Sequence, residues 1–239
     1  MEDKKVPDSL VDVAYRNIYD KIYNFELCPG QMISDFALSK ELGVSRTPIR
    51  QALQRLENDG LIYDEGAGKG YKVCEITLED IEDLLDAREA LETAALRLAT
   101  QKHYLPENIQ VLIKSNELLK AVDGKVRVSE QFANNQRFHE QIVQLSHNTR
   151  LIKFNKSLMI QMTRIRVLSF LEHLDPGNPD GAFKSHQELI QYIVDGENDK
   201  AVRFLSNHIV SVKRTYEKML EDQISWNSYG VLQYLMKNI

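Results

Sequence analysis

The stretch Leu42–Ile62, LGVSRTPIRQALQRLENDGLI, places a turn glycine, a polar residue and two arginines in an order typical of a DNA-reading helix. Gly43 falls where two helices meet, and a tight turn there requires the positive φ angle that glycine adopts at little cost. Ser45 is predicted to cap the next helix. Arg46 and Arg50 are four residues apart, so they point the same way. The stretch therefore predicts the second helix of a helix-turn-helix.

Apolar residues around the turn predict the contact between the two crossing helices: Leu38, Leu42, Val44, Ile49 and Ala52, with the small Ser39 at the closest approach. The N-terminal end of such a second helix reaches base edges in the major groove. An arginine there can hold guanine O6 and N7, which contributes about 1–3 kcal/mol of discrimination. Ser45 and Thr47 offer hydroxyls to phosphate beside free backbone N–H groups. We expect the guanidinium groups of Arg46 and Arg50 to project without partners from neighbouring residues.

A wing is predicted after this helix. Two short strands, 61–63 and 71–73, are joined by the glycine-rich stretch DEGAGKG. Lys69 would lie at the wing tip, near the minor groove or the backbone of DNA, and Gly70 would allow a close approach. The alternative is a small helical subdomain with surface arginines. The turn glycine, polar cap, twin arginines and wing in series argue against it.

Long helical patterns follow residue 76 almost without interruption, near 78–101, 106–122, 127–146, 150–172, 183–195 and 198–222. Thr77 and Asp80 resemble a capping box at their start. The predicted fold is therefore mainly α, with an N-terminal winged helix-turn-helix over residues 1–76 and a C-terminal all-helical bundle over residues 77–223. Residues 224–239 predict an extra helix or tail that packs on its own bundle or on a partner subunit.

The composition agrees with a globular protein, since 43% of the 239 residues are hydrophobic and 27% are charged. The net charge of -5 argues mildly against nucleic acid, but DNA binding needs only a local basic face. The start of the chain, MEDKKVPDSL, does not resemble a signal peptide, and no apolar run approaches the roughly 18 residues of a membrane span. Cys28 and Cys74 are far apart and lack metal-type spacing. Two isolated cysteines in a chain without an export signal suggest a reducing compartment, so we expect a cytoplasmic protein with no membrane partner.

Arg88 lies on the apolar stripe of the first long helix, where a guanidinium needs an anionic partner. The sequence leaves two interpretations open: an internal ion pair with Glu92 or Glu140, and a clamp for a carboxylate ligand. Arg164 and Arg166 are further candidates, for which a surface position is favoured.

Three histidines, His139, His186 and His208, each continue an apolar helical stripe. A lone histidine on such a face is usually a core residue, but three in one bundle also predict a site for zinc, nickel or manganese. Asn135 lies four residues before His139 on the same face and could offer a weak fourth ligand. A metal-dependent enzyme that activates water at this site is the alternative function, with Glu140 as the only evident base.

The N-terminal motifs resemble a known family. LCPGQMIS, LSKELGVSRTPIRQALQRLENDGLI and GKGYKV, within residues 10–75, look like the winged helix-turn-helix of the GntR family of bacterial transcription regulators. The resemblance implies DNA contacts by Arg46, Thr47 and Arg50, and a wing tip at Lys69 and Gly70. Phe36 departs from some relatives of the FadR type, which carry a DNA-contacting arginine there.

The C-terminal motifs LLDAREALETAALRLA, NNQRFHEQIVQLSHN and SHQELIQYIVDGENDKAVRFLSNHI resemble the all-helical effector domain of the FadR-type subfamily, the FCD domain. Many members hold a divalent metal with an aspartate and three histidines, which correspond here to Asn135, His139, His186 and His208. Because Asn135 is neutral, metal affinity should fall or depend on an anionic effector.

The resemblance also implies how such a protein works. Its ligand would be a small organic or sugar acid, with Arg88 at a position that faces it. A homodimer would bind a pseudo-palindromic DNA operator, and effector binding would change the affinity for that operator. Repression that the ligand relieves is the mode that the family favours.

Overall fold

The computed structural model describes residues 8–101, 106–120, 128–165 and 181–221, and the chain divides between Ile76 and Thr77 into two compact units. The predicted tail at 224–239 and Arg166 lie outside the described residues. None of the described helices combines the length and the apolar character that crossing a membrane would require.

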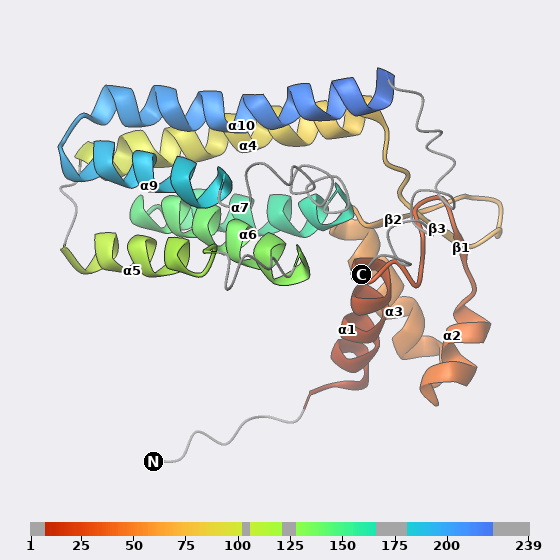
Figure 1. Ribbon diagram of the computed structural model, residues 1–239. Coiled ribbons are helices and arrows are strands. Elements are labelled where there is room, and N and C mark those ends of the chain that lie inside the picture. Colours follow the sequence, from red (N-terminus) through yellow and green to blue (C-terminus); the bar gives the residue numbers. More distant parts are fainter. Residues whose placement is uncertain (1–7, 102–105, 121–127, 166–180, 222–239) are drawn as a thin grey trace, which may run out of the picture. The chain divides into compact units, whose positions relative to one another are not determined.

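The first unit combines three helices with a small sheet (Figure 1). Its elements are α1 (Leu10–Tyr23), β1 (Met32–Ile33), α2 (Asp35–Leu42), α3 (Arg46–Asn58), β2 (Ile62–Asp64) and β3 (Tyr71–Val73). The strands are antiparallel in the order β1-β3-β2, with Ile62 opposite Val73 and Ile33 opposite Tyr71. The sequence predicted β2 and β3 but not β1, because two residues are too short to show an alternating pattern.

Helix α3 owes its position to an apolar face that packs against α1. Ile49, Ala52 and Leu53 are fully buried, as are Ala14 and Ile18 on α1. The turn between α2 and α3 is closed as predicted: Gly43 has a φ of 63°. The hydroxyl of Ser39 donates a hydrogen bond of 2.6 Å to the carbonyl of Val44. The helix-turn-helix is therefore fixed on both sides of its turn.

The second unit is entirely helical in the residues that the structure describes. Its elements are α4 (Leu78–Gln101), α5 (Pro106–Glu117), α6 (Val128–Leu145), α7 (Thr149–Met162), the 3₁₀ helix η1 (Thr163–Ile165), α9 (Gly181–Val194) and α10 (Asn198–Glu221). The predicted mainly α fold, a winged helix-turn-helix followed by a helical bundle, is confirmed. The predicted helix at 150–172 instead tightens into 3₁₀ geometry after Met162, where the Thr163 hydroxyl bonds to the Ile160 carbonyl at 2.6 Å.

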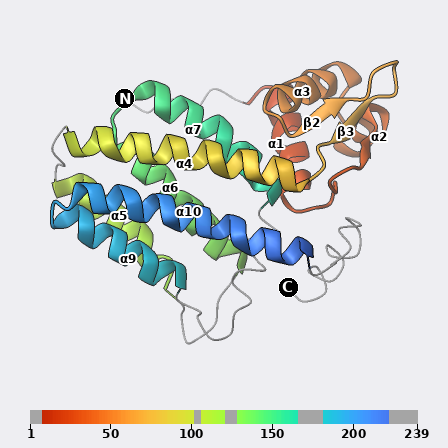
Figure 2. The ribbon, with the colours of Figure 1, turned by 90° about the horizontal axis from the view of Figure 1, so that it is seen from above.

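The long helices α4 and α10 run side by side along the bundle, as Figures 1 and 2 both show. Helix α4 also packs against α6 and α7, and α9 packs against α5 and α10. The stripe of α4 that faces this core includes Leu85, Leu96 and Ala99, together with two charged residues, Arg88 and Glu92. This core is the place where the predicted histidines gather.

The structure corrects the surface position favoured for Arg164. Its side chain is only 4% exposed, and Nη2 lies 3.0 Å from Oδ1 of Asp80. Asp80 belongs to the first turn of α4, where its backbone N–H donates to the hydroxyl of Thr77 at 3.1 Å, as the capping box predicted. A partly buried ion pair thus joins η1, at the end of α7, to the beginning of α4.

Candidate functional site

The two predicted reading arginines lie at the start of α3. Their side chains are exposed, 52% for Arg46 and 63% for Arg50. The expectation that they have no intramolecular partner is wrong, because both guanidinium groups contact the carboxylate of Asp35 on α2. This contact could not be predicted from sequence patterns, since Asp35 comes 11 and 15 residues earlier in the chain.

Asp35 binds the two arginines unequally. Arg46 donates from Nη2 to both carboxylate oxygens, at 3.0 and 2.9 Å, and from Nε at 3.3 Å. Arg50 donates from Nε to Oδ2 at 2.7 Å. These contacts lower the pKa of Asp35 below its ordinary value, the hydrogen bond from Arg50 most strongly. The carboxylate therefore stays ionised at neutral pH, and one anion lies between two cations.

The backbone at the start of α3 is available to a ligand. Ser45 occupies the N-cap position, but its side chain makes no capping hydrogen bond. Ser45 and Thr47 are both exposed. Helix starts carry N–H groups without intrahelical partners, and these attract anions. This helix start can thus offer N–H groups and hydroxyls to a phosphate, next to the two arginines.

The wing has its predicted place between β2 and β3. Backbone hydrogen bonds of 3.0 Å from Glu65 to Gly70 and from Lys69 to Gly66 shape its turn, and Lys69 is exposed at the tip. Gly70 has a φ of 97°, and a Cβ atom there would lie 3.4 Å from the Ile33 carbonyl. The fold of the wing thus requires this glycine independently of DNA.

The structure brings the three predicted histidines together. One ring nitrogen from each of His139, His186 and His208 lies within 4.8 Å of the other two. His139 and His186 are buried, and His208 is half-buried. Nε2 of His186 lies 3.2 Å from Nε2 of His208. The ring of Phe138 stacks on His186 with centroids 3.8 Å apart, which fixes the plane of that imidazole.

A buried carboxylate supports the cluster from α4. Oε2 of Glu92 lies 2.7 Å from Nδ1 of His139, and its Oε1 accepts a hydrogen bond of 2.7 Å from Nε of Arg88. An ionised Glu92 can only accept, so Nδ1 of His139 carries the proton and Nε2 presents its lone pair. That Nε2 is buried and has no hydrogen-bond partner among the described residues. A carboxylate behind a histidine in this way is a common support of metal ligands.

Arg88 has the internal ion pair that was one of its two interpretations. The partner is Glu92, and Glu140 instead accepts a hydrogen bond of 3.2 Å from Gln136. The contact of Arg88 with an effector remains a prediction. Its charge nevertheless reaches the cluster, because it lowers the pKa of both His139 and His208.

Burial favours the form of the histidines that binds metal. It is the main reason that the pKa of His139 falls well below its ordinary value and that the pKa of His208 falls to about 4. Both are therefore neutral near pH 7, as metal ligands must be. Burial raises the pKa of the Glu92 carboxyl, and the adjacent Arg88 acts against that rise.

The distance between two of the donor nitrogens fits a divalent metal. Two nitrogens bound to a tetrahedral zinc at about 2.0–2.1 Å lie about 3.3 Å apart, close to the 3.2 Å between His186 and His208. Asn135 precedes His139 by one turn of α6, and its Oδ1 is buried without a hydrogen-bond partner in the part of the chain that the structure describes. His139 and His208 are thus neutral near pH 7, and Asn135 as a ligand remains a prediction.

The roles of Asp35 and Ser185, and the contact of Glu92 with His139, were missed from the sequence, although Glu92 was named as a possible partner of Arg88. Asp35 could not be found, because its contact depends on the crossing of α2 and α3. The hydroxyl of Ser185, 2.9 Å from Nδ1 of His208, likewise joins two different helices. Glu92 did carry a signal, since it follows Arg88 by four residues on the same apolar stripe and is too costly to bury without partners.

Two family models match the chain. The model described as bacterial regulatory proteins, gntR family, matches residues 10–69, and the FCD domain matches residues 83–211. The chain is 33% identical over 196 residues to the uncharacterized HTH-type transcriptional regulator YdhC of Bacillus subtilis (strain 168). This alignment covers 81% of this chain and 85% of that protein. It is 22% identical to the HTH-type transcriptional repressor RspR of Escherichia coli (strain K12), over 90% of this chain and 92% of that one.

A solved structure has the same fold. E. coli McbR/YncC superimposes with a TM-score of 0.69 over 91% of this chain and 99% of its own, at 20% identity. Such a likeness supports the fold alone, whereas the two family models together span both units of the chain. The protein belongs to the GntR family of bacterial transcription regulators, in the subfamily whose C-terminal domain is an FCD domain.

Proposed function

We propose that this protein is a cytoplasmic repressor that binds an operator through α3 and the wing and responds to a small carboxylate in its helical unit. The observation that carries the proposal is the exposed arginine pair at an open helix start, within a winged helix-turn-helix. The assignment as a regulator agrees with its family, and the repressor mode is supported by the name of its relative RspR.

The proposed DNA contacts follow from the chemistry of the interface. Arg46, Thr47 and Arg50 would face the major groove, and Ser45 with the N–H groups of the helix start would bind phosphate. Lys69 and Gly70 at the wing tip would contact the minor groove or the backbone. Family members of this kind act on palindromic sites as dimers, so we include a homodimer in the proposal.

The helical unit is proposed to hold a divalent metal on His139, His186 and His208, with Asn135 as a weak fourth ligand. When bound, the ion would offer a positive centre to a carboxylate. The charges of the site favour an anion: an ionised Glu92 offsets Arg88, and His139 and His208 are neutral near pH 7, so the ion's two positive charges have no compensation among these residues. A small organic or sugar acid would supply it.

Binding must distinguish two arrangements of the protein to affect DNA. An effector changes operator affinity only by the difference between its affinities for the two states. The alternative, a metal-dependent enzyme, is not favoured: Glu140, its candidate base, is bonded to Gln136, and the relatives are regulators.

The DNA part of the proposal is tested with duplexes that the wild-type protein selects from a random pool. Arg46→Ala should weaken binding to the selected operator by about 1–3 kcal/mol in fluorescence anisotropy. Arg16→Ala removes the same charge from α1, where Arg16 pairs with Asp8, and should leave operator binding nearly unchanged. Wild-type affinity in Arg46→Ala would contradict the proposed interface.

The effector part is tested by thermal shift. Sugar acids and dicarboxylates are screened with and without zinc, nickel or manganese, because a ligand that binds only the folded state raises its melting temperature. Any acid that stabilises the protein is then added to the anisotropy assay, where it should change operator affinity. If no acid shifts melting in the presence of any of the three metals, the effector proposal fails.

A further inference from the structure

Asp35 holds both reading arginines and has no assigned role. Its carboxylate receives three hydrogen bonds from Arg46 and one from Arg50. The carboxylate is 22% exposed, whereas both arginine side chains are more than half exposed. A surface ion pair contributes little to stability, so stability alone does not explain why one acid is shared by two cations.

The acid sits on a rigid part of the fold. Asp35 is the first residue of α2, immediately after the N-cap Ser34, whose hydroxyl accepts a hydrogen bond of 3.2 Å from the N–H of Ala37. At the other end of α2, Gly43 and the bond between Ser39 and Val44 fix the crossing to α3. The position of the carboxylate relative to the start of α3 is thus determined by two helices rather than by a loop.

The contacts leave donors for DNA. Among the hydrogen bonds of the described residues, Asp35 engages Arg50 only through Nε, so both terminal amino groups of Arg50 stay outside this contact. Those two groups form an edge that can bind guanine O6 and N7 together. Arg46 gives Nε and Nη2 to Asp35, which leaves Nη1 outside. Asp35 therefore orients each guanidinium group and still leaves N–H donors that can bind DNA.

Orientation and charge both affect specificity. A free arginine loses rotamer freedom when it binds a base, and it can attach to phosphate at any sequence. A fixed carboxylate reduces the first cost, because the side chains are already placed, and it repels phosphate. Specificity is the difference between the affinities for the right and the wrong sites, so a group that weakens binding at wrong sites raises specificity.

We infer that Asp35 is a positioning residue for sequence readout, which holds Arg46 and Arg50 in place before DNA arrives and limits their attachment to phosphate at wrong sequences. The inference rests on the proposed DNA-binding function. It assigns Asp35 a role in discrimination between the operator and other DNA, not in affinity for DNA as such.

The test compares Asp35→Asn with wild type on the selected operator and on a random duplex, over a series of salt concentrations. We expect tighter binding to the random duplex, with a salt slope about one unit steeper, since a released arginine gains a phosphate contact. The ratio of operator to random affinity should fall by about tenfold. Asp35→Glu keeps the carboxylate and should restore most of the ratio.

Glu41→Gln is the matched control, because it removes one negative charge from the same helix at a residue that pairs with Lys21 instead. It should leave the ratio unchanged. An unchanged ratio in Asp35→Asn, or an equal fall in Glu41→Gln, would overturn the inference while the proposed function stands. A wild-type protein that selects no operator would instead overturn the proposed function, and the inference with it.

Discussion

Glu92 Oε2 lies 2.7 Å from Nδ1 of His139, and both side chains are buried in the core of the helical unit. When it is ionised, the Glu92 carboxylate can only accept, so it determines that Nδ1 of the imidazole carries the proton. It therefore also determines that Nε2 presents a lone pair to the other two histidines. A residue that does not touch the ion would thus control whether His139 can bind it.

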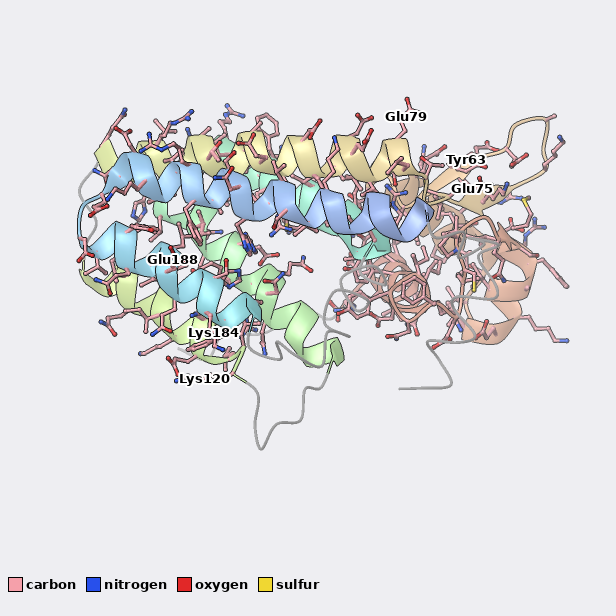
Figure 3. The ribbon with its side chains drawn as sticks, turned by 45° about the horizontal axis from the view of Figure 1, so that its top comes forward. Tyr63, Glu75, Glu79, Lys120, Lys184 and Glu188 are labelled. Atoms are coloured by element: carbon pink, nitrogen blue, oxygen red, sulfur yellow. The ribbon has the colours of Figure 1, made fainter. Side chains whose placement is uncertain are left out.

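Glu92→Gln should lower the affinity for zinc by about 10–100-fold, the usual effect of removing such a supporting residue. The amide can accept from Nδ1–H less strongly, and Arg88 loses its anionic partner. Affinity is measured by competition with a chromogenic chelator. The matched control is Glu188→Gln on α9, an exposed carboxylate that bonds to Tyr192 and is labelled in Figure 3. Equal affinities in the two variants would exclude a role of Glu92 in metal binding.

Asn135→Asp should tighten metal binding and make it less dependent on an organic acid. A carboxylate offers a charged oxygen where the amide offers a neutral one, so it compensates part of the charge that an effector would otherwise balance. Calorimetric titration with zinc, with and without citrate as a model carboxylate, measures both effects. Asn134→Asp, one residue earlier on α6, controls for the added charge. Unchanged zinc affinity in Asn135→Asp would show that this residue is not a ligand.

Phe36→Arg should strengthen DNA binding and steepen its salt dependence by about one unit, as one new phosphate contact would. Phe36 is 67% exposed and follows Asp35 directly, so an arginine there can reach the same DNA surface without loss of core packing. Phe36→Gln, which removes the ring and adds no charge, is the control. A slope equal to wild type would indicate that the start of α2 does not approach the backbone of DNA.

The sequence was sufficient for those features that depend on neighbours along one helix. Gly43 and Thr77 mark helix ends by local chemistry, and the structure places both where the sequence predicted. The apolar stripes of α6 and α9 likewise predicted that His139 and His186 would face the core, since helical period determines which face a residue occupies.

Features that depend on two elements could not be predicted in the same way. Asp35 meets Arg46 and Arg50 only because α2 crosses α3, and Arg164 is buried only because the end of α7 packs near the start of α4. A polar residue read along its own helix looks exposed when its partner is distant in sequence. The two wrong expectations, free reading arginines and a surface Arg164, have this common cause.

The pair of Asp80 and Arg164 should couple the start of α4 to the end of α7 by about 1–2 kcal/mol in a double-mutant cycle. Asp80→Ala leaves a guanidinium that is only 4% exposed without this carboxylate, and should lower the free energy of unfolding by about 2 kcal/mol. Asp80→Ala combined with Arg164→Met should lose less than the sum of the two single changes, because the second change removes the charge left behind. Urea unfolding followed by circular dichroism reports mainly on this helical unit. Glu79→Ala, at the exposed neighbour that Figure 3 labels at the start of α4, controls for the loss of an acidic residue near the helix N-terminus. Additive effects of the Asp80 and Arg164 substitutions would show that the ion pair contributes nothing to stability.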